Sequence, residues 1–95
     1  MKKIKAQIYL FMYSGRRSPI KSDYRPAFSF DNKTFYTGHI ELINQDFFEL
    51  GTSNEVFVSF IDDKVIKEYL KTGVCFSINE PPNMIGEGKI IEVID

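Results

Sequence analysis

Few residues in this chain have side chains suited to catalysis or metal binding. There is one histidine, His39, and one cysteine, Cys75, so neither a closed zinc shell nor an internal disulfide can form. Cys75 follows Val74 in an apolar run without a neighbouring base, and we interpret it as a structural residue. His39 falls at outward-facing strand positions, where we expect it to meet solvent or a partner.

Two further patterns have residue types found in chemical motifs. The carboxylates of Asp62 and Asp63 are adjacent, and neighbours on a strand point to opposite faces, so they are not expected to share a proton or a metal. Gly86-Glu87-Gly88 lacks the lysine of a phosphate-binding loop. We therefore expect no catalytic residues, no metal, no cofactor, no small-molecule substrate and no GTP binding, and the sequence does not indicate an enzyme.

A basic loop and an aromatic–arginine pair stand out more clearly. The loop reads Gly15-Arg16-Arg17-Ser18-Pro19, and the pair belongs to Tyr24-Arg25-Pro26. Guanidinium groups bind phosphate bidentately or stack on aromatic rings. The alternative interpretation is a solvated loop with an arginine at a strand edge that pairs with a carboxylate.

Composition limits the class of protein. The chain has 95 residues, with 12 basic and 13 acidic side chains and a formal net charge of −1. A length of this order fits a single domain, residues 1–95, and the charge leaves room only for a local nucleic-acid contact. We find neither a signal-peptide pattern nor an apolar run of membrane-spanning length, so the expected location is cytoplasmic.

Period-two alternation dominates the chain and predicts an all-β fold. At residues 5–13, Ile8, Leu10 and Met12 share one face, and Tyr9, Phe11 and Tyr13 share the other. Gly38 suggests a bulge in its strand, and helical spacing predicts a short helical turn within residues 63–71. Six strands separated by short turns favour a closed barrel or a sandwich; they cover residues 5–13, 24–30, 35–42, 56–61, 74–78 and 85–94.

Four ordered runs carry a resemblance to a known family. Ser14–Pro19 and Asp23–Phe30 resemble the Gly-Gly-Arg-His-Thr-Pro and Gly-Tyr-Arg-Pro-Gln-Phe-Tyr-Phe runs in the third, C-terminal domain of translation elongation factor Tu. Thr37–Leu42 is similar to that domain's Thr-Gly-Thr-Ile-Glu-Leu. The fourth run, Phe76–Glu80 followed by Ile85–Ile91, resembles that domain's Phe-Ala-Ile-Arg-Glu and Val-Gly-Ala-Gly-Val-Val. The order and spacing of the four runs agree with those of the domain over nearly the whole chain. The resemblance implies a six-stranded antiparallel closed barrel that binds partners and has no catalytic residue.

The resemblance also implies contacts with tRNA and with protein. Arg16 and Arg25 match family arginines, Arg17 replaces a histidine that approaches tRNA, and Thr37 matches a threonine in the same region. Other positions depart from the family. Ala27 stands at a tRNA-contacting glutamine, Pro81 lies near a glycine whose backbone meets RNA, and Asn79 and Asn83 lie where two arginines are expected. The RNA-facing surface has therefore lost hydrogen-bond donors.

These considerations favour a protein partner over tRNA. The partner would be a translation component or a toxin directed at the factor, in which case the chain would act as a decoy or immunity protein. Tyr9, Phe11 and Tyr13 are the predicted apolar partner face, unless the segment 62–71 folds over them. The remaining predicted contacts are Arg16, Arg17, Tyr24, Arg25, Thr37 and His39; in the alternative, an RNA-binding accessory domain, Arg16, Arg17, Arg25 and Lys64 would meet the tRNA.

Overall fold

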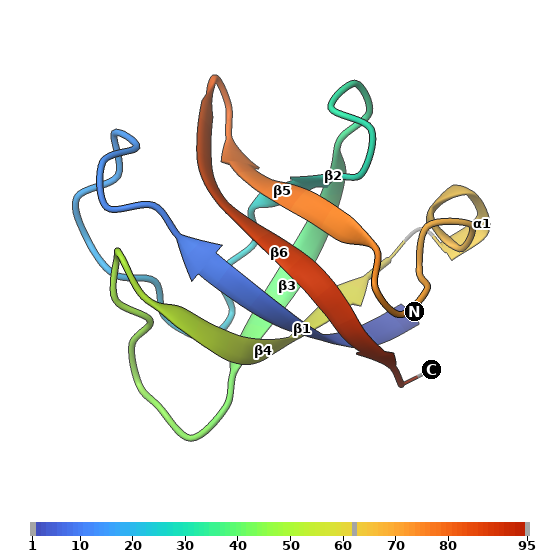
Figure 1. The fold of residues 1–95 in the computed structure, drawn as a ribbon, viewed down its shortest axis with the longest axis horizontal. Helices are drawn as coiled ribbons and strands as arrows, with labels where there is room; N and C mark the ends of the chain where they lie inside the picture. The colour runs from blue at the N-terminus through green and yellow to red at the C-terminus, as the bar shows by residue number, and fades with distance from the viewer. Residues whose placement is uncertain (1, 62, 95) are drawn as a thin grey trace.

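The computed structural model describes residues 2–61 and 63–94 and confirms the all-β prediction. Six antiparallel strands close into a barrel in the order β1-β4-β3-β2-β5-β6 (Figure 1). The elements are β1 (Lys2–Leu10), β2 (Ala27–Ser29), β3 (Tyr36–Leu42), β4 (Ser53–Phe60), α1 (Asp63–Ile66), β5 (Cys75–Glu80) and β6 (Asn83–Val93). Within the described residues, no helix is long and apolar enough to span a bilayer.

The core follows from the period-two alternation of the strands. Ile4, Ala6, Ile8 and Leu10 of β1 all point inward and are fully or almost fully buried. Met12 was predicted to continue this face, and that prediction is wrong. Regular pairing in β1 ends at Leu10, and Met12 is 50% exposed with its side chain beside Gly51.

The segment after β4 closes one end of the barrel. The predicted helical turn is confirmed at Asp63–Ile66, while Asp62 lies outside the described residues. Ile66 and Leu70 are buried in the core, and the Tyr69 ring stacks on Phe30 with centroids 5.0 Å apart. Figure 1 shows α1 on the side of the barrel where both termini lie, opposite the long loop that follows β1.

Two loops close the opposite end of the barrel. Ile20, in the loop between β1 and β2, and Phe48, in the loop between β3 and β4, exchange backbone hydrogen bonds of 3.1 and 2.9 Å. Both side chains are completely buried. This pairing holds the loop that contains the predicted basic residues against the end of the barrel.

A turn at Asp31-Asn32-Lys33 joins β2 to β3. The carboxylate oxygen Oδ1 of Asp31 accepts hydrogen bonds from the backbone N–H groups of Lys33 and Thr34, each at 2.8 Å. These bonds, that of Thr34 first, lower the pKa of Asp31 below its usual value, because they stabilise the charged form. The turn therefore directs the chain into β3.

Gly38 serves the core and does not produce a bulge. The pairing of β3 with β4 begins at Gly38 opposite Phe60 and has no register shift, and Thr37 next to it pairs with Ala27 of β2; the register shifts of the barrel lie between Lys5 and Ala6 and between Ile78 and Asn79. A Cβ atom at Gly38 would lie 2.5 Å from the Phe28 ring and 2.9 Å from the Phe60 ring. The missing side chain thus gives two core aromatics their space.

We expect Gly38→Ala to lower the free energy of unfolding by about 1–3 kcal/mol, since overpacking displaces buried rings. Chemical denaturation of the purified protein measures this change. Thr37→Ala, at the exposed neighbouring position, is the matched control and should stay within about 0.5 kcal/mol of the parent. An equal, small effect of both variants would contradict the packing role of Gly38.

Candidate functional site

The predicted contact residues fall into three places on the barrel surface. Arg16 and Tyr24 lie together in the loop between β1 and β2. Tyr9 is near the end of β1, with Phe11 and Tyr13 just beyond it. Arg17 and Arg25 lie in the same loop as Arg16. Thr37 and His39 lie on β3.

Arg16 is bound to its own protein. Its Nη1 pairs with the Glu80 carboxylate and lies 3.5 Å from the Tyr24 hydroxyl oxygen. Its Nε and Nη2 donate to the carbonyl oxygens of Ser18 and Pro19, at 2.9 and 3.2 Å. The guanidinium carbon also lies 4.7 Å from the centre of the Tyr24 ring. All three nitrogens are thus engaged, and a phosphate would have to displace these contacts.

The contacts of Arg16 connect distant parts of the chain. Glu80 ends β5, so the ion pair attaches the loop between β1 and β2 to the β5–β6 hairpin. Gly15 allows the loop to approach the hairpin closely. It has a φ of +95°, and a Cβ atom there would lie 2.9 Å from Asn83 Nδ2. We call the contact of Arg16 with Tyr24 and Glu80 the loop latch.

Arg17 and Arg25 have different surroundings. Both side chains are exposed, and neither makes an ion pair or hydrogen bond with another described residue. The alternative interpretation expected a solvated loop and an ion pair at the strand-edge arginine. In the described residues Arg25 forms no such pair, and the loop residue Arg16 pairs with Glu80 instead. These two exposed guanidinium groups are available to a partner.

The predicted residues on β3 lie on its outer face. Thr37 is exposed and pairs across the sheet with Ala27. His39 is half-buried, and its Nε2 lies 2.6 Å from Oδ1 of Asp23. His39 therefore faces outward as expected. Its contact with Asp23 also holds the chain just before Tyr24 against β3.

The predicted aromatic face is open. Tyr9 is 37% exposed and Tyr13 is 96% exposed. Phe11 is half-buried, and its ring lies 5.8 Å from that of Tyr9. The segment after β4 leaves these residues exposed, because the Tyr69 ring in that segment packs on Phe30 at the far end of the barrel. We call Tyr9, Phe11 and Tyr13 the aromatic face.

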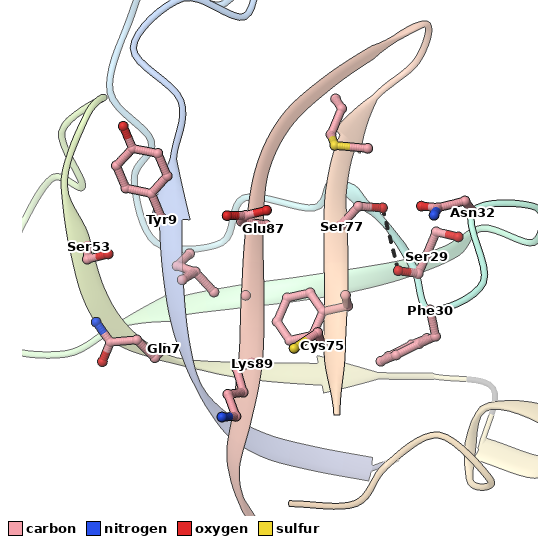
Figure 2. Close-up of a pocket in the computed structure, with 14 residues that line it drawn as sticks. Gln7, Tyr9, Ser29, Phe30, Asn32, Ser53, Cys75, Ser77, Glu87 and Lys89 are labelled. Atoms are coloured by element: carbon pink, nitrogen blue, oxygen red, sulfur yellow. Dashed lines mark hydrogen bonds between the residues drawn. The ribbon is translucent and has the colours of Figure 1, made fainter. Parts of the chain in front are cut away.

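A groove that the sequence did not predict lies beside the aromatic face. It has a volume of about 590 Å³ and runs over the outer faces of β1, β6, β5 and β2 (Figure 2). Pairing across the strands places Tyr9, Glu87, Ser77 and Ser29 in one row. Several lining residues are small, among them Ser29, Cys75, Ser77 and Gly88, and this leaves space between the larger side chains.

The floor of the groove is polar and internally bonded. Ser29 and Ser77 are buried, and the Ser77 hydroxyl donates to the Ser29 carbonyl oxygen at 3.5 Å, as Figure 2 shows. Asn79 Nδ2 donates to the Ser77 hydroxyl oxygen at 2.9 Å. The alternation of Cys75, Ser77 and Asn79 with apolar residues was a visible signal for a polar outer face. The pairing that makes it a groove joins distant segments.

The walls of the groove offer both charges. Glu87 and Lys89 are exposed on β6, and the Cys75 thiol is exposed on β5. Residues 2–61 and 63–94 contain no group of three or more His, Cys, Asp or Glu placed to hold a metal ion. The arrangement suits recognition of a polar surface through hydrogen bonds and opposite charges.

No protein-family model matches this chain. We therefore infer the function of the chain from the geometry of the loop latch, the aromatic face and the groove.

Replacing Arg16 should show how much the loop latch contributes to stability. We expect Arg16→Met to lower the free energy of unfolding by about 1–3 kcal/mol, because Glu80 loses its partner in a partly buried position. Arg17→Met is the matched control and should change it by less than about 0.5 kcal/mol.

A double-mutant cycle of Arg16→Met with Glu80→Gln isolates the pair, and denaturant unfolding provides the four stabilities. Strictly additive effects of the two substitutions would contradict a direct interaction between these side chains.

Proposed function

We propose that this chain is a non-catalytic binding module whose outer barrel surface binds a protein partner. The observation that carries the proposal is the exposed aromatic face next to a polar groove. Tyrosine offers a large rigid contact area with a polar tip, and it is enriched among residues that dominate binding energy. Tyr13, at 96% exposure, has no structural burial to account for its type.

The resemblance to the third domain of elongation factor Tu supports this proposal. Ser14–Pro19 lies in the loop that carries the latch, Asp23–Phe30 leads from that loop through β2, and Thr37–Leu42 lies in β3. The final run lies in β5 and β6. The similar residues thus coincide with the barrel framework and the loop latch. We infer a barrel related to that domain, with a surface adapted to another partner.

The partner we propose is a translation component or a toxin that recognises the factor. In the second case the chain would act as an immunity protein, because a barrel that presents the same surface would occupy the toxin. Both versions require a direct protein contact at the aromatic face. They differ only in the identity of the protein bound.

Substitution of the aromatic face tests the proposal. We expect Tyr9→Ser combined with Tyr13→Ser to weaken the partner complex at least tenfold, because two contact side chains are removed. The partner is first captured with tagged parent protein, and its affinity is then measured by calorimetry. Ile61→Ser is the matched control, since Ile61 is 72% exposed and follows β4 at the other end of the barrel.

The control variant should bind the partner like the parent. Capture of RNA alone, or equal affinity of the doubly substituted and parent proteins, would contradict the proposal. Circular dichroism spectra of all variants establish that the barrel has formed.

RNA binding is the second candidate, favoured by the two exposed arginines that have no partner among the described residues. A tRNA complex through Arg17 and Arg25 would weaken steeply with salt, by a logarithmic slope of about 0.9 for each phosphate neutralised on a duplex stem. Replacing both with alanine would reduce that slope by about 2. Under our first proposal, we expect no tRNA complex at low salt in an electrophoretic shift assay.

A further inference from the structure

A second hollow lies between the loop after β1 and the loop after β3. Its volume is about 480 Å³, and the backbone pairing of Ile20 with Phe48 brings its two sides together. Six of its lining residues matter here: Arg16, Ser18, Lys21, Ser22, Tyr24 and Phe47. We call it the loop hollow.

The loop hollow has hydrogen-bond donors without matching acceptors. The exposed Lys21 ammonium lies 5.5 Å from the centre of the Phe47 ring and forms no ion pair with a described residue. The Ser22 hydroxyl oxygen accepts the Leu42 N–H at 3.0 Å, so its own hydrogen remains free to donate. The exposed Ser18 hydroxyl likewise has no partner among the described side chains and backbone groups.

No acidic side chain lines the loop hollow to balance these donors. Glu80, which neutralises Arg16, is not among its lining residues. The hollow therefore presents one uncompensated ammonium together with two hydroxyl donors. Its complement is a single negative charge that accepts several hydrogen bonds.

The walls indicate what carries this charge. Phe47 is 47% exposed, and the Tyr24 ring is fixed by Arg16. Both rings line the hollow and offer apolar area, that of Phe47 next to the ammonium, and the volume exceeds what one carboxylate fills. An anionic group with adjacent apolar surface fits both features.

Charge distinguishes a protein from a nucleic acid as the source of this anion. A nucleic acid brings a row of phosphates and needs several free cations, whereas Lys21 is the single uncompensated cation in the lining. The net charge of the chain, −1, also opposes a polyanion. We propose that the loop hollow receives an aspartate or glutamate side chain flanked by an apolar residue of the protein partner. This inference depends on the proposed function and specifies the chemistry of the partner.

Small peptides test this proposal without the partner. We expect N-acetyl-Glu-Phe-amide to shift the backbone amide signals of residues 18–24 and 47–48 in a nitrogen-15 NMR titration of the full chain. N-acetyl-Gln-Phe-amide, which lacks the charge, should bind at least fivefold more weakly. Binding of the Glu peptide should also weaken as salt is raised to 0.5 M, since one charge pair is screened.

Variants of Lys21 identify the cation. Lys21→Met should weaken the Glu peptide at least fivefold, and Lys21→Arg should retain it. Lys33→Met is the matched control, because Lys33 is exposed in the β2–β3 turn and does not line the hollow. The amide signals outside the hollow should be unchanged in each variant, which verifies the fold.

Three results would overturn the inference. The first is equal binding of the Glu and Gln peptides, and the second is a set of shifted signals that maps outside the loop hollow. The third is a tRNA that shifts the signals of the loop hollow and binds more tightly than the Glu peptide. Tyr9→Ser with Tyr13→Ser should leave peptide binding intact. A failure of the aromatic face as a partner contact is therefore distinguishable from a failure of this site.

Discussion

Closure of the sheet is the constraint on which the other features depend. Because β6 pairs with β1, the six strands leave no free edge, and each strand must place alternate side chains inside one small core. Alternate positions then face outward at fixed spacings, which is how Tyr9, Glu87 and Ser77 come to lie in one row. The barrel thus acts as a rigid support that fixes both the outward-facing strand positions and the ends of its loops.

The two ends of the barrel are sealed by different segments, and this decides which surface stays open. Ile66 and Leu70 fill the end beside α1, while Ile20 and Phe48 fill the other. A segment already packed into the core at one end is not available to cover Tyr13 at the other. The aromatic face is consequently exposed by the architecture, and it does not require a conformational change to become accessible.

Alternation of apolar residues was sufficient to predict the strands, because burial of one face of a strand produces a period-two pattern among residues that are neighbours in sequence. Errors arose where a neighbour distant in sequence decides the outcome. Gly38 resembles a bulge until the Phe28 and Phe60 rings are placed beside it, and Met12 continues the apolar parity after regular pairing has ended. The loop latch could not be predicted for the same reason, because Arg16 and Glu80 are 64 residues apart. The groove could not be predicted either, because the row of side chains along it joins β1 to β6 and β5 at the other end of the chain.

The loop latch bears on the choice between protein and RNA as a partner. An arginine in the first loop would suit phosphate if it were free, but Arg16 is held by Glu80, Tyr24 and two carbonyl oxygens. Its charge therefore stabilises the loop and adds little to the field outside. What remains on that surface is a few separated cations among tyrosines and hydroxyl groups, a composition closer to a protein interface than to a phosphate-binding surface. Under the proposed relationship, a barrel could thus exchange an RNA partner for a protein through outer side chains such as Ala27 and Asn79, with its core and latch unchanged.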